Sequence, residues 1–163
     1  MSEYDFDKLQ LFQCLSPEQR DQVRPLFVPC EFEPETVIFE QGEATKYLYL
    51  ILEGEITIHF KPDDGPALIV ARVRPEGIVG WSAALGSPSY TSAAITTTEC
   101  HLLRVHGSDL RTLCEKYPET GALVLERLAT VIAERLRNTH EHVIALLEQG
   151  LRVRNLPIAQ SVK

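Results

Sequence analysis

Short apolar runs, separated by turns rich in glycine and proline, occupy the middle of the chain. Ile56, Ile58 and Phe60 alternate with polar residues, which predicts a half-buried strand. Further strands are predicted at residues 36–39, 47–52, 68–73, 78–79, 93–98 and 101–105. Short strands at near-regular spacing favour a sandwich, jelly roll or barrel over alternating βαβ units.

Helical patterns flank this strand-rich region. Ser16, Pro17 and Gln19 carry the signature of a capping box, so a helix is predicted to begin there and to end at Pro29. A second short helix is predicted between Ser108 and Pro118. The sequence therefore predicts a mainly β domain with flanking helices.

A long C-terminal helix is predicted from about residue 118 to 151. Beyond Pro118 this stretch contains no proline, and glycine occurs only at Gly121 and Gly150. Roughly 30 residues of helix are about 45 Å long, so the far half needs another surface to cover its apolar stripe, and a second copy of the chain is the simplest one. The stripe consists of Leu125, Leu128, Ile132, Leu136, Val143, Leu146 and Leu147.

Charge and cysteine content narrow the class of protein. The net charge of −7 is unlike that of nucleic-acid binders, which carry a basic face, and it disfavours adsorption to anionic membranes. The four cysteines show no CxxC spacing, the first residues lack the apolar core of a signal peptide, and the apolar run at residues 47–52 is too short to span a bilayer. We expect a cytoplasmic protein with reduced thiols.

Four segments resemble one known family. They are residues 37–43 (VIFEQGE), 48–56 (LYLILEGEI), 77–85 (GIVGWSAAL) and 100–105 (CHLLRV). With the order of the predicted elements, they make the chain from about residue 6 to 150 similar to the cyclic nucleotide-binding domain of catabolite-activator-type regulators and of kinase regulatory subunits.

The resemblance implies a β jelly roll that contains a short phosphate-binding helix, and a long helix that pairs in a homodimer. In bacterial regulators of this type a helix-turn-helix DNA-binding domain usually follows that helix. Here about a dozen residues follow it, too few for a DNA-reading helix and its support. We expect a sensor domain at residues 1–151, a short tail at 152–163, and no direct DNA binding.

The candidate ligand site follows the predicted strand at residues 78–79. Gly80 permits a close approach of the backbone, and Ser82 and Ala83 can begin a one-turn helix whose N–H groups face an anion. Thr91 and Ser92 could donate hydroxyl hydrogen bonds to the same cyclic phosphate. Val79 and Tyr90 complete this part of the predicted site.

Two positions depart from the family pattern. The resemblance places a glutamate directly after the glycine, where this chain has Trp81, and an arginine about ten residues later, where it has Thr91 or Tyr90. Arg74 and Arg104 are the nearest arginines in sequence that could replace it. Trp81 is either a flat wall for a planar ligand or an aromatic plug that fills an emptied cavity.

Thr139 and His140 interrupt the apolar stripe of the long helix. In activator-type relatives, polar residues at the matching turn touch the nucleobase, so one interpretation is a ligand lid. The other is a polar notch that fixes the register of the helix pair.

Enzyme motifs and metal-ligand spacings are missing from the sequence, so no catalytic or metal-binding residue is predicted. The sequence favours a regulatory module for a cyclic nucleotide or another small ligand. The alternative is a ligand-free scaffold for dimerisation or docking. No particular cofactor is predicted, and a further protein partner remains open.

Overall fold

The computed structural model describes residues 6–63 and 65–154. The chain divides into two compact units, Met1–Val131 and Ile132–Lys163. The first unit contains every described strand and all the shorter helices.

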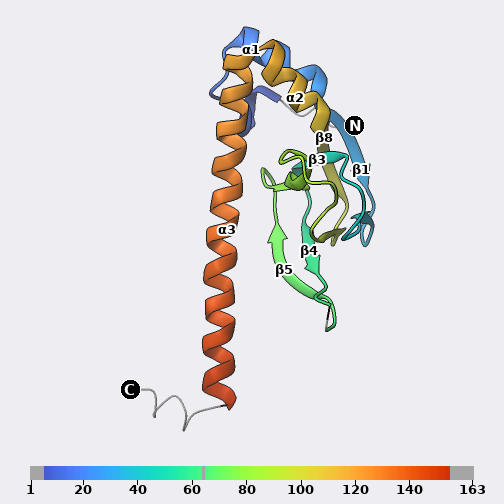
Figure 1. Ribbon diagram of the computed structural model, residues 1–163, viewed down its shortest axis with the longest axis vertical. Helices are drawn as coiled ribbons and strands as arrows, with labels where there is room; N and C mark the ends of the chain where they lie inside the picture. Colours follow the sequence, from blue (N-terminus) through green and yellow to red (C-terminus); the bar gives the residue numbers. More distant parts are fainter. Residues whose placement is uncertain (1–5, 64, 155–163) are drawn as a thin grey trace. The chain divides into compact units, whose positions relative to one another are not determined.

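Two four-stranded antiparallel sheets form the first unit (Figure 1). The first sheet has the strand order β1-β8-β3-β6, and the second has the order β2-β7-β4-β5. This confirms the predicted jelly roll. The strands are β1 (Val28–Phe32), β2 (Val37–Phe39), β3 (Tyr47–Glu53), β4 (Ile56–Phe60), β5 (Leu68–Val73), β6 (Ile78–Val79), β7 (Ala93–Thr96) and β8 (Cys100–His106).

Helices pack beside the first sheet. The helix α1 (Pro17–Val23) begins with the predicted capping box, in which the Ser16 side chain and the Gln19 side chain each accept a backbone hydrogen bond. The remaining helical segments of this unit are η1 (Phe6–Lys8), η2 (Gln10–Phe12), η3 (Arg24–Leu26), η4 (Trp81–Ala83), α2 (Gly107–Lys116) and the start of α3.

The strand β1 was not predicted. Pro29 was interpreted as the end of a helix, but it lies inside β1 opposite Leu103 of β8. Because β1 is at the edge of its sheet, its outer side pairs with no described strand and needs no backbone N–H donors. An edge strand therefore tolerates proline, which has no backbone N–H. The helical turn ends earlier, at Leu26.

Two apolar cores lie on opposite faces of the first sheet. Alternate residues of β3 divide between them, because successive side chains of a strand point to opposite faces. Leu48 and Leu50 join a core shared with the helices, here called the helix-side core. Tyr49 and Ile51 join a core between the two sheets, here called the roll core.

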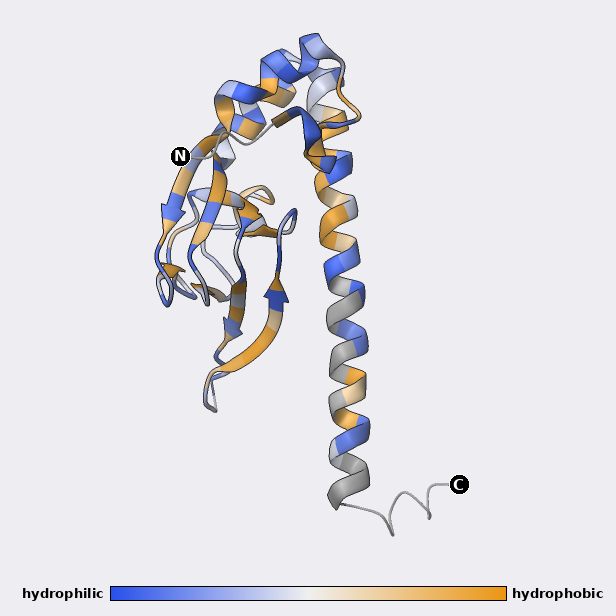
Figure 2. Cartoon of the chain, turned by 180° about the vertical axis from the view of Figure 1, so that it is seen from behind, coloured by the Kyte–Doolittle hydropathy of each residue, from blue (hydrophilic) through white to orange (hydrophobic). Residues whose placement is uncertain are grey.

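The β4–β5 hairpin carries apolar residues that join neither core. Phe60, Leu68 and Ile69 are exposed, and the hydropathy colouring of β5 in Figure 2 makes this apolar run visible. The predicted alternation of β4 therefore fails at its far end, where Phe60 is exposed, whereas the polar Thr57 is buried.

The long helix is confirmed as α3 (Pro118–Arg154), with 37 residues. Its first turns belong to the first unit, where Val124 and Leu128 are buried in the helix-side core. From Ile132 onward it belongs to the second unit, in which Ile144 is 42% exposed and Leu147 is 61% exposed. Among the helices that the structure describes, none combines the length and apolarity that a bilayer span requires. The predicted tail lies almost wholly outside the described residues.

Candidate ligand-binding site

The predicted site is built around the end of β6. Val79 is fully buried in the roll core and pairs with Tyr49 of β3. The chain then turns at Gly80, which has a φ of +78° and caps η4. Only glycine adopts this conformation without strain.

Gly80 also brings the turn into close contact with β3. A Cβ atom at this position would lie 2.8 Å from the Tyr47 carbonyl oxygen and 3.4 Å from Tyr90 Cε1. The missing side chain therefore lets the turn pack directly on the backbone of Tyr47. This close approach fixes where η4 begins.

The short helix η4 offers polar groups that have few protein partners. Its first hydrogen bonds run from the Ala83 N–H to Gly80 and from the Ala84 N–H to Trp81, so the Ser82 N–H precedes the first donor of the helix. The Ser82 residue is only 8% exposed, and its hydroxyl hydrogen-bonds to no residue that the structure describes. A buried hydroxyl without a partner is costly, and a bound ligand would satisfy it.

Tyr90 is a buried structural residue in this structure. Its hydroxyl donates to the Tyr47 carbonyl at 2.7 Å and accepts from the Tyr47 and Lys46 N–H groups at 3.0 and 3.2 Å. Its ring stacks on Phe39 with centroids 3.8 Å apart. The hydroxyl is therefore already occupied, and the ring fills the roll core next to Gly80.

Trp81 packs on the side of the helices. Its side chain is half-buried and packs against the helix-side core, whereas Val79 packs in the roll core. The two predicted roles, a flat wall for a planar ligand and a plug of an emptied cavity, stay predictions. The turn at Gly80 redirects the chain, and the following residue then faces the helices.

Thr91 and Ser92 follow Tyr90 on the loop that leads into β7. Thr91 is exposed and Ser92 is half-buried. Neither hydroxyl hydrogen-bonds within the described part of the chain. Their role in binding a ligand stays a prediction, and both side chains are neutral.

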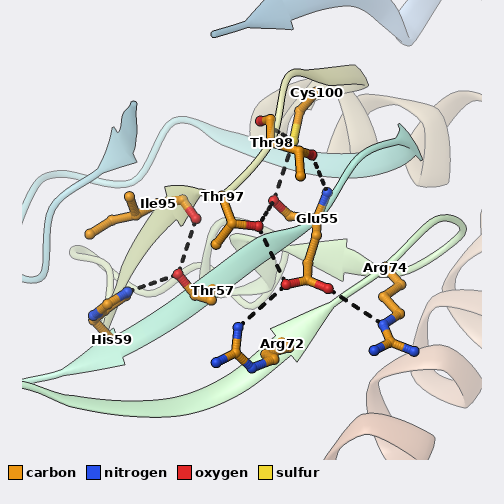
Figure 3. A network of polar contacts seen from close by, with 9 residues as sticks. All are labelled: Glu55, Thr57, His59, Arg72, Arg74, Ile95, Thr97, Thr98 and Cys100. Atoms are coloured by element: carbon orange, nitrogen blue, oxygen red, sulfur yellow. Dashed lines mark hydrogen bonds and ion pairs between the residues drawn. The ribbon is translucent and has the colours of Figure 1, made fainter. Parts of the chain in front are cut away.

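Arg74 is engaged at the surface. Its Nε atom lies 3.5 Å from Glu55 Oε2, and its side chain is 77% exposed. Glu55 Oε1 also accepts hydrogen bonds from Arg72 Nη1 at 3.4 Å and from the Thr97 hydroxyl at 3.3 Å, and Figure 3 shows this network. Because this network occupies Arg74, the residue is a poor replacement for the missing arginine.

Arg104 lies on β8 with its side chain toward the roll. Cys100 and Leu102, which share its parity on the strand, belong to the roll core, whereas Leu103 belongs to the helix-side core. The Arg104 guanidinium carbon lies 4.5 Å from the centre of the Tyr47 ring. Of Arg74 and Arg104, only Arg104 is directed into the fold.

This arrangement matches a known family. The model of the cyclic nucleotide-binding domain matches residues 29–117, more than half of the chain, from the second residue of β1 to just beyond the end of α2. The chain belongs to the cyclic nucleotide-binding domain family.

Individual relatives agree with that assignment. A CRP-like cAMP-activated global transcriptional regulator of Mycobacterium tuberculosis is 26% identical over 137 residues, covering 84% of this chain. The alignment spans 59% of that relative, so the chain corresponds to only part of it. The catabolite activator protein of Thermus thermophilus has a TM-score of 0.67 at 26% identity, with 83% of this chain and 62% of the other covered.

A third comparison involves a protein closer in size. A putative cyclic nucleotide-binding protein from Geobacter metallireducens has a TM-score of 0.68 at 25% identity, with 78% of this chain and 92% of that chain covered. The relatives carry regulatory and binding names. The cyclic nucleotide-binding fold is therefore shown for this chain, and its ligand is a separate question.

Thr139 and His140, the other part of the predicted site, lie on α3 in the second unit. His140 is exposed, and the Thr139 side chain is outside the described residues. The ligand-lid and register interpretations both stay predictions.

The reactivity of the Cys30 thiol measures how well this side chain is buried in the cyclic nucleotide-binding domain. Burial raises the pKa of Cys30 on β1 to about 11, and nearby Arg104 offsets this only in part. At pH 8 roughly one Cys30 in a thousand is then a thiolate, the reactive form. We expect a maleimide to modify Cys30 at least about 10-fold more slowly than the exposed Cys14. Peptide mass spectrometry of time points measures both rates; equal rates would contradict this burial.

Proposed function

We propose that this chain is the ligand-sensing module of a regulatory protein. A small molecule binds inside the roll beside η4, and the response passes to α3. The observation that carries the proposal is the Gly80 turn, which packs on Tyr47 and leads into η4 with the buried, unpartnered Ser82 hydroxyl. The names of its relatives, which include cAMP-activated regulators, support the same class of function.

We further propose that cAMP and cGMP bind weakly or are replaced by another small ligand. The resemblance places a glutamate and an arginine where this chain has Trp81 and Thr91, and Trp81 packs on the helix side. Each hydrogen bond to a charged group contributes about 1.5–3 kcal/mol, so losing two weakens binding by roughly 10²- to 10⁴-fold. A micromolar ligand would become a millimolar one.

A thermal-shift screen tests this proposal. The full chain is melted with about 1 mM of cAMP, cGMP, AMP or adenosine, because a ligand that binds only the folded state raises the melting temperature. We expect at least one of these compounds to raise it reproducibly. The absence of any shift across the nucleotides and a wider set of small anions would contradict ligand sensing.

One observation favours the alternative, a ligand-free scaffold. Tyr90 and Phe39 stack beside Gly80 and fill part of the roll that a ligand would share. A scaffold of this kind would dimerise or dock without responding to nucleotides. The screen above separates the two functions.

In both cases we propose a homodimer through α3. Ile144 and Leu147 are three residues apart on one side of the helix, and both are exposed within the single chain. Exposed apolar residues in a row on a long helix are typical of a helix-pairing surface.

Changing Leu147 to glutamate tests the dimer. We expect the dimer dissociation constant to rise at least about 10-fold, because a charge replaces a buried apolar contact in the pair. Sedimentation velocity over a concentration series measures it. The matched control is Gln149→Glu, which adds the same charge at another exposed position of α3. Equal dissociation constants for the two variants would argue against this interface.

A further inference from the structure

A polar cluster lies within the roll, beside the strand β3 on which the Gly80 turn packs. It is formed by side chains from three neighbouring strands of the first sheet: Cys30 from β1, Tyr47 and Tyr49 from β3, and Arg104 from β8. Arg104 lies directly opposite Tyr49 in the β3–β8 ladder. Val79, the residue before the Gly80 turn, pairs with Tyr49 on the other side.

The cation of this cluster has no counter-charge from the protein. Arg104 is half-buried, and it forms no ion pair with any carboxylate in the part of the chain that the structure describes. One face of its guanidinium covers the Tyr47 ring at 4.5 Å. The N–H groups along its edge remain available as donors, and they suit an oxyanion.

The hydroxyl of Tyr49 adds a second unused donor. Tyr49 is only 6% exposed, and among the described residues no group hydrogen-bonds to its hydroxyl. Burial raises the pKa of Tyr49, and the neighbouring Arg104 opposes this shift. The phenol therefore stays protonated and can donate. Tyr90 shows the contrast, because its buried hydroxyl makes three backbone hydrogen bonds.

We propose that Arg104 and Tyr49 hold the anionic group of a small phosphate-bearing ligand inside the roll. This inference rests on the proposed ligand-sensing function and names the groups that perform it. The positive charge then comes from a strand of the first sheet and not from the loop at Thr91. A half-buried cation without a counter-charge and a buried hydroxyl without a hydrogen-bond partner both gain a partner when an oxyanion binds.

The test compares binding to the full chain of cAMP, AMP, inorganic phosphate and uncharged adenosine by calorimetry. Four variants are used. Arg104→Met keeps the stem over Tyr47 and removes the charge, Arg104→Lys keeps the charge without the planar fork, and Tyr49→Phe removes only the hydroxyl. Arg74→Met is the matched control, because it removes an arginine that the surface network holds.

We expect Arg104→Met to weaken binding of the phosphate-bearing probe at least about 10-fold, with Arg104→Lys intermediate. Tyr49→Phe is expected to weaken it about 3- to 10-fold without lowering the melting temperature of the free protein, since the hydroxyl has no partner to lose. Arg74→Met should bind like the unchanged protein. If inorganic phosphate binds to the same groups and cAMP binds no more tightly, the site is assigned to the free anion. If cAMP binds far more tightly than inorganic phosphate, the site is assigned to a nucleotide.

Other outcomes overturn the inference. If Arg104→Met, still folded by its melting curve, binds the probe as tightly as the unchanged protein, the anion lies elsewhere while ligand sensing stands. Adenosine binding as tightly as cAMP would have the same meaning. If no probe binds, adenosine included, both this inference and the nucleotide-sensing function fail.

Discussion

Replacing Gly80 with alanine is expected to lower the free energy of unfolding by about 2–4 kcal/mol and to remove ligand binding. A left-handed backbone costs a non-glycine residue about 1–2 kcal/mol. Here a Cβ atom would also lie 2.8 Å from the Tyr47 carbonyl oxygen, a backbone atom that cannot move without disturbing β3. Urea unfolding followed by circular dichroism measures the change in stability.

Gly86→Ala is the matched control for this prediction. Gly86 has a similar φ of +74°, but no atom lies within 4 Å of a Cβ placed there. We expect it to cost about 1–2 kcal/mol, the conformational part alone. If the two variants were equally stable, the close approach of Gly80 to β3 would carry no energetic weight, and the position of η4 would have another cause.

Thr91→Arg is expected to tighten cAMP binding by about 10- to 100-fold. Thr91 is exposed and follows Tyr90, whose ring packs against the Gly80 position, and the family pattern has its arginine at about this position. One charge-assisted hydrogen bond of about 1.5–3 kcal/mol corresponds to that gain. Because Thr91 makes no hydrogen bond within the described residues, the substitution removes no existing contact.

Thr91→Met separates charge from side-chain length in the same titration. It should bind cAMP as the unchanged protein does. The gain from Thr91→Arg should also shrink as the salt concentration rises, because ions screen an exposed charge. An arginine that brings no gain at low salt would mean that position 91 does not face the ligand, and the comparison with the family pattern would then fail at this residue.

Local signals predicted the elements that depend on local chemistry. The capping box at Ser16 and the uninterrupted helix after Pro118 were both confirmed, because side chains a few residues apart decide them. The strand β1 was missed because Pro29 stops a helix as readily as it fits an edge strand. That β1 is an edge strand depends on the order of strands in the sheet, which is known only once the pairing of β1 with β8 is known.

The site was harder to predict because strand faces cannot be assigned from a continuous apolar run. Residues 47–52 are all apolar or aromatic, so no alternation indicates that Tyr49 faces the roll and Leu50 faces the helices. For the same reason, the face of the sheet on which the Arg104 side chain lies could not be predicted from the sequence. The packing of Trp81 was equally hidden, because the turn at Gly80 sends this side chain to the helix-side core. Pairing and backbone direction, more than composition, decide these positions.

We propose that the roll of this cyclic nucleotide-binding domain still binds a small anionic ligand, more weakly than a site with both charged residues of the family pattern. Calorimetric titration of the full chain with cAMP tests it most directly. We predict saturable binding at one site per chain, with a dissociation constant between about 0.1 mM and several millimolar. Low-micromolar binding would contradict the predicted weakness. Absence of saturable heat at millimolar cAMP, together with none for AMP or inorganic phosphate, would contradict the anion site and favour the scaffold.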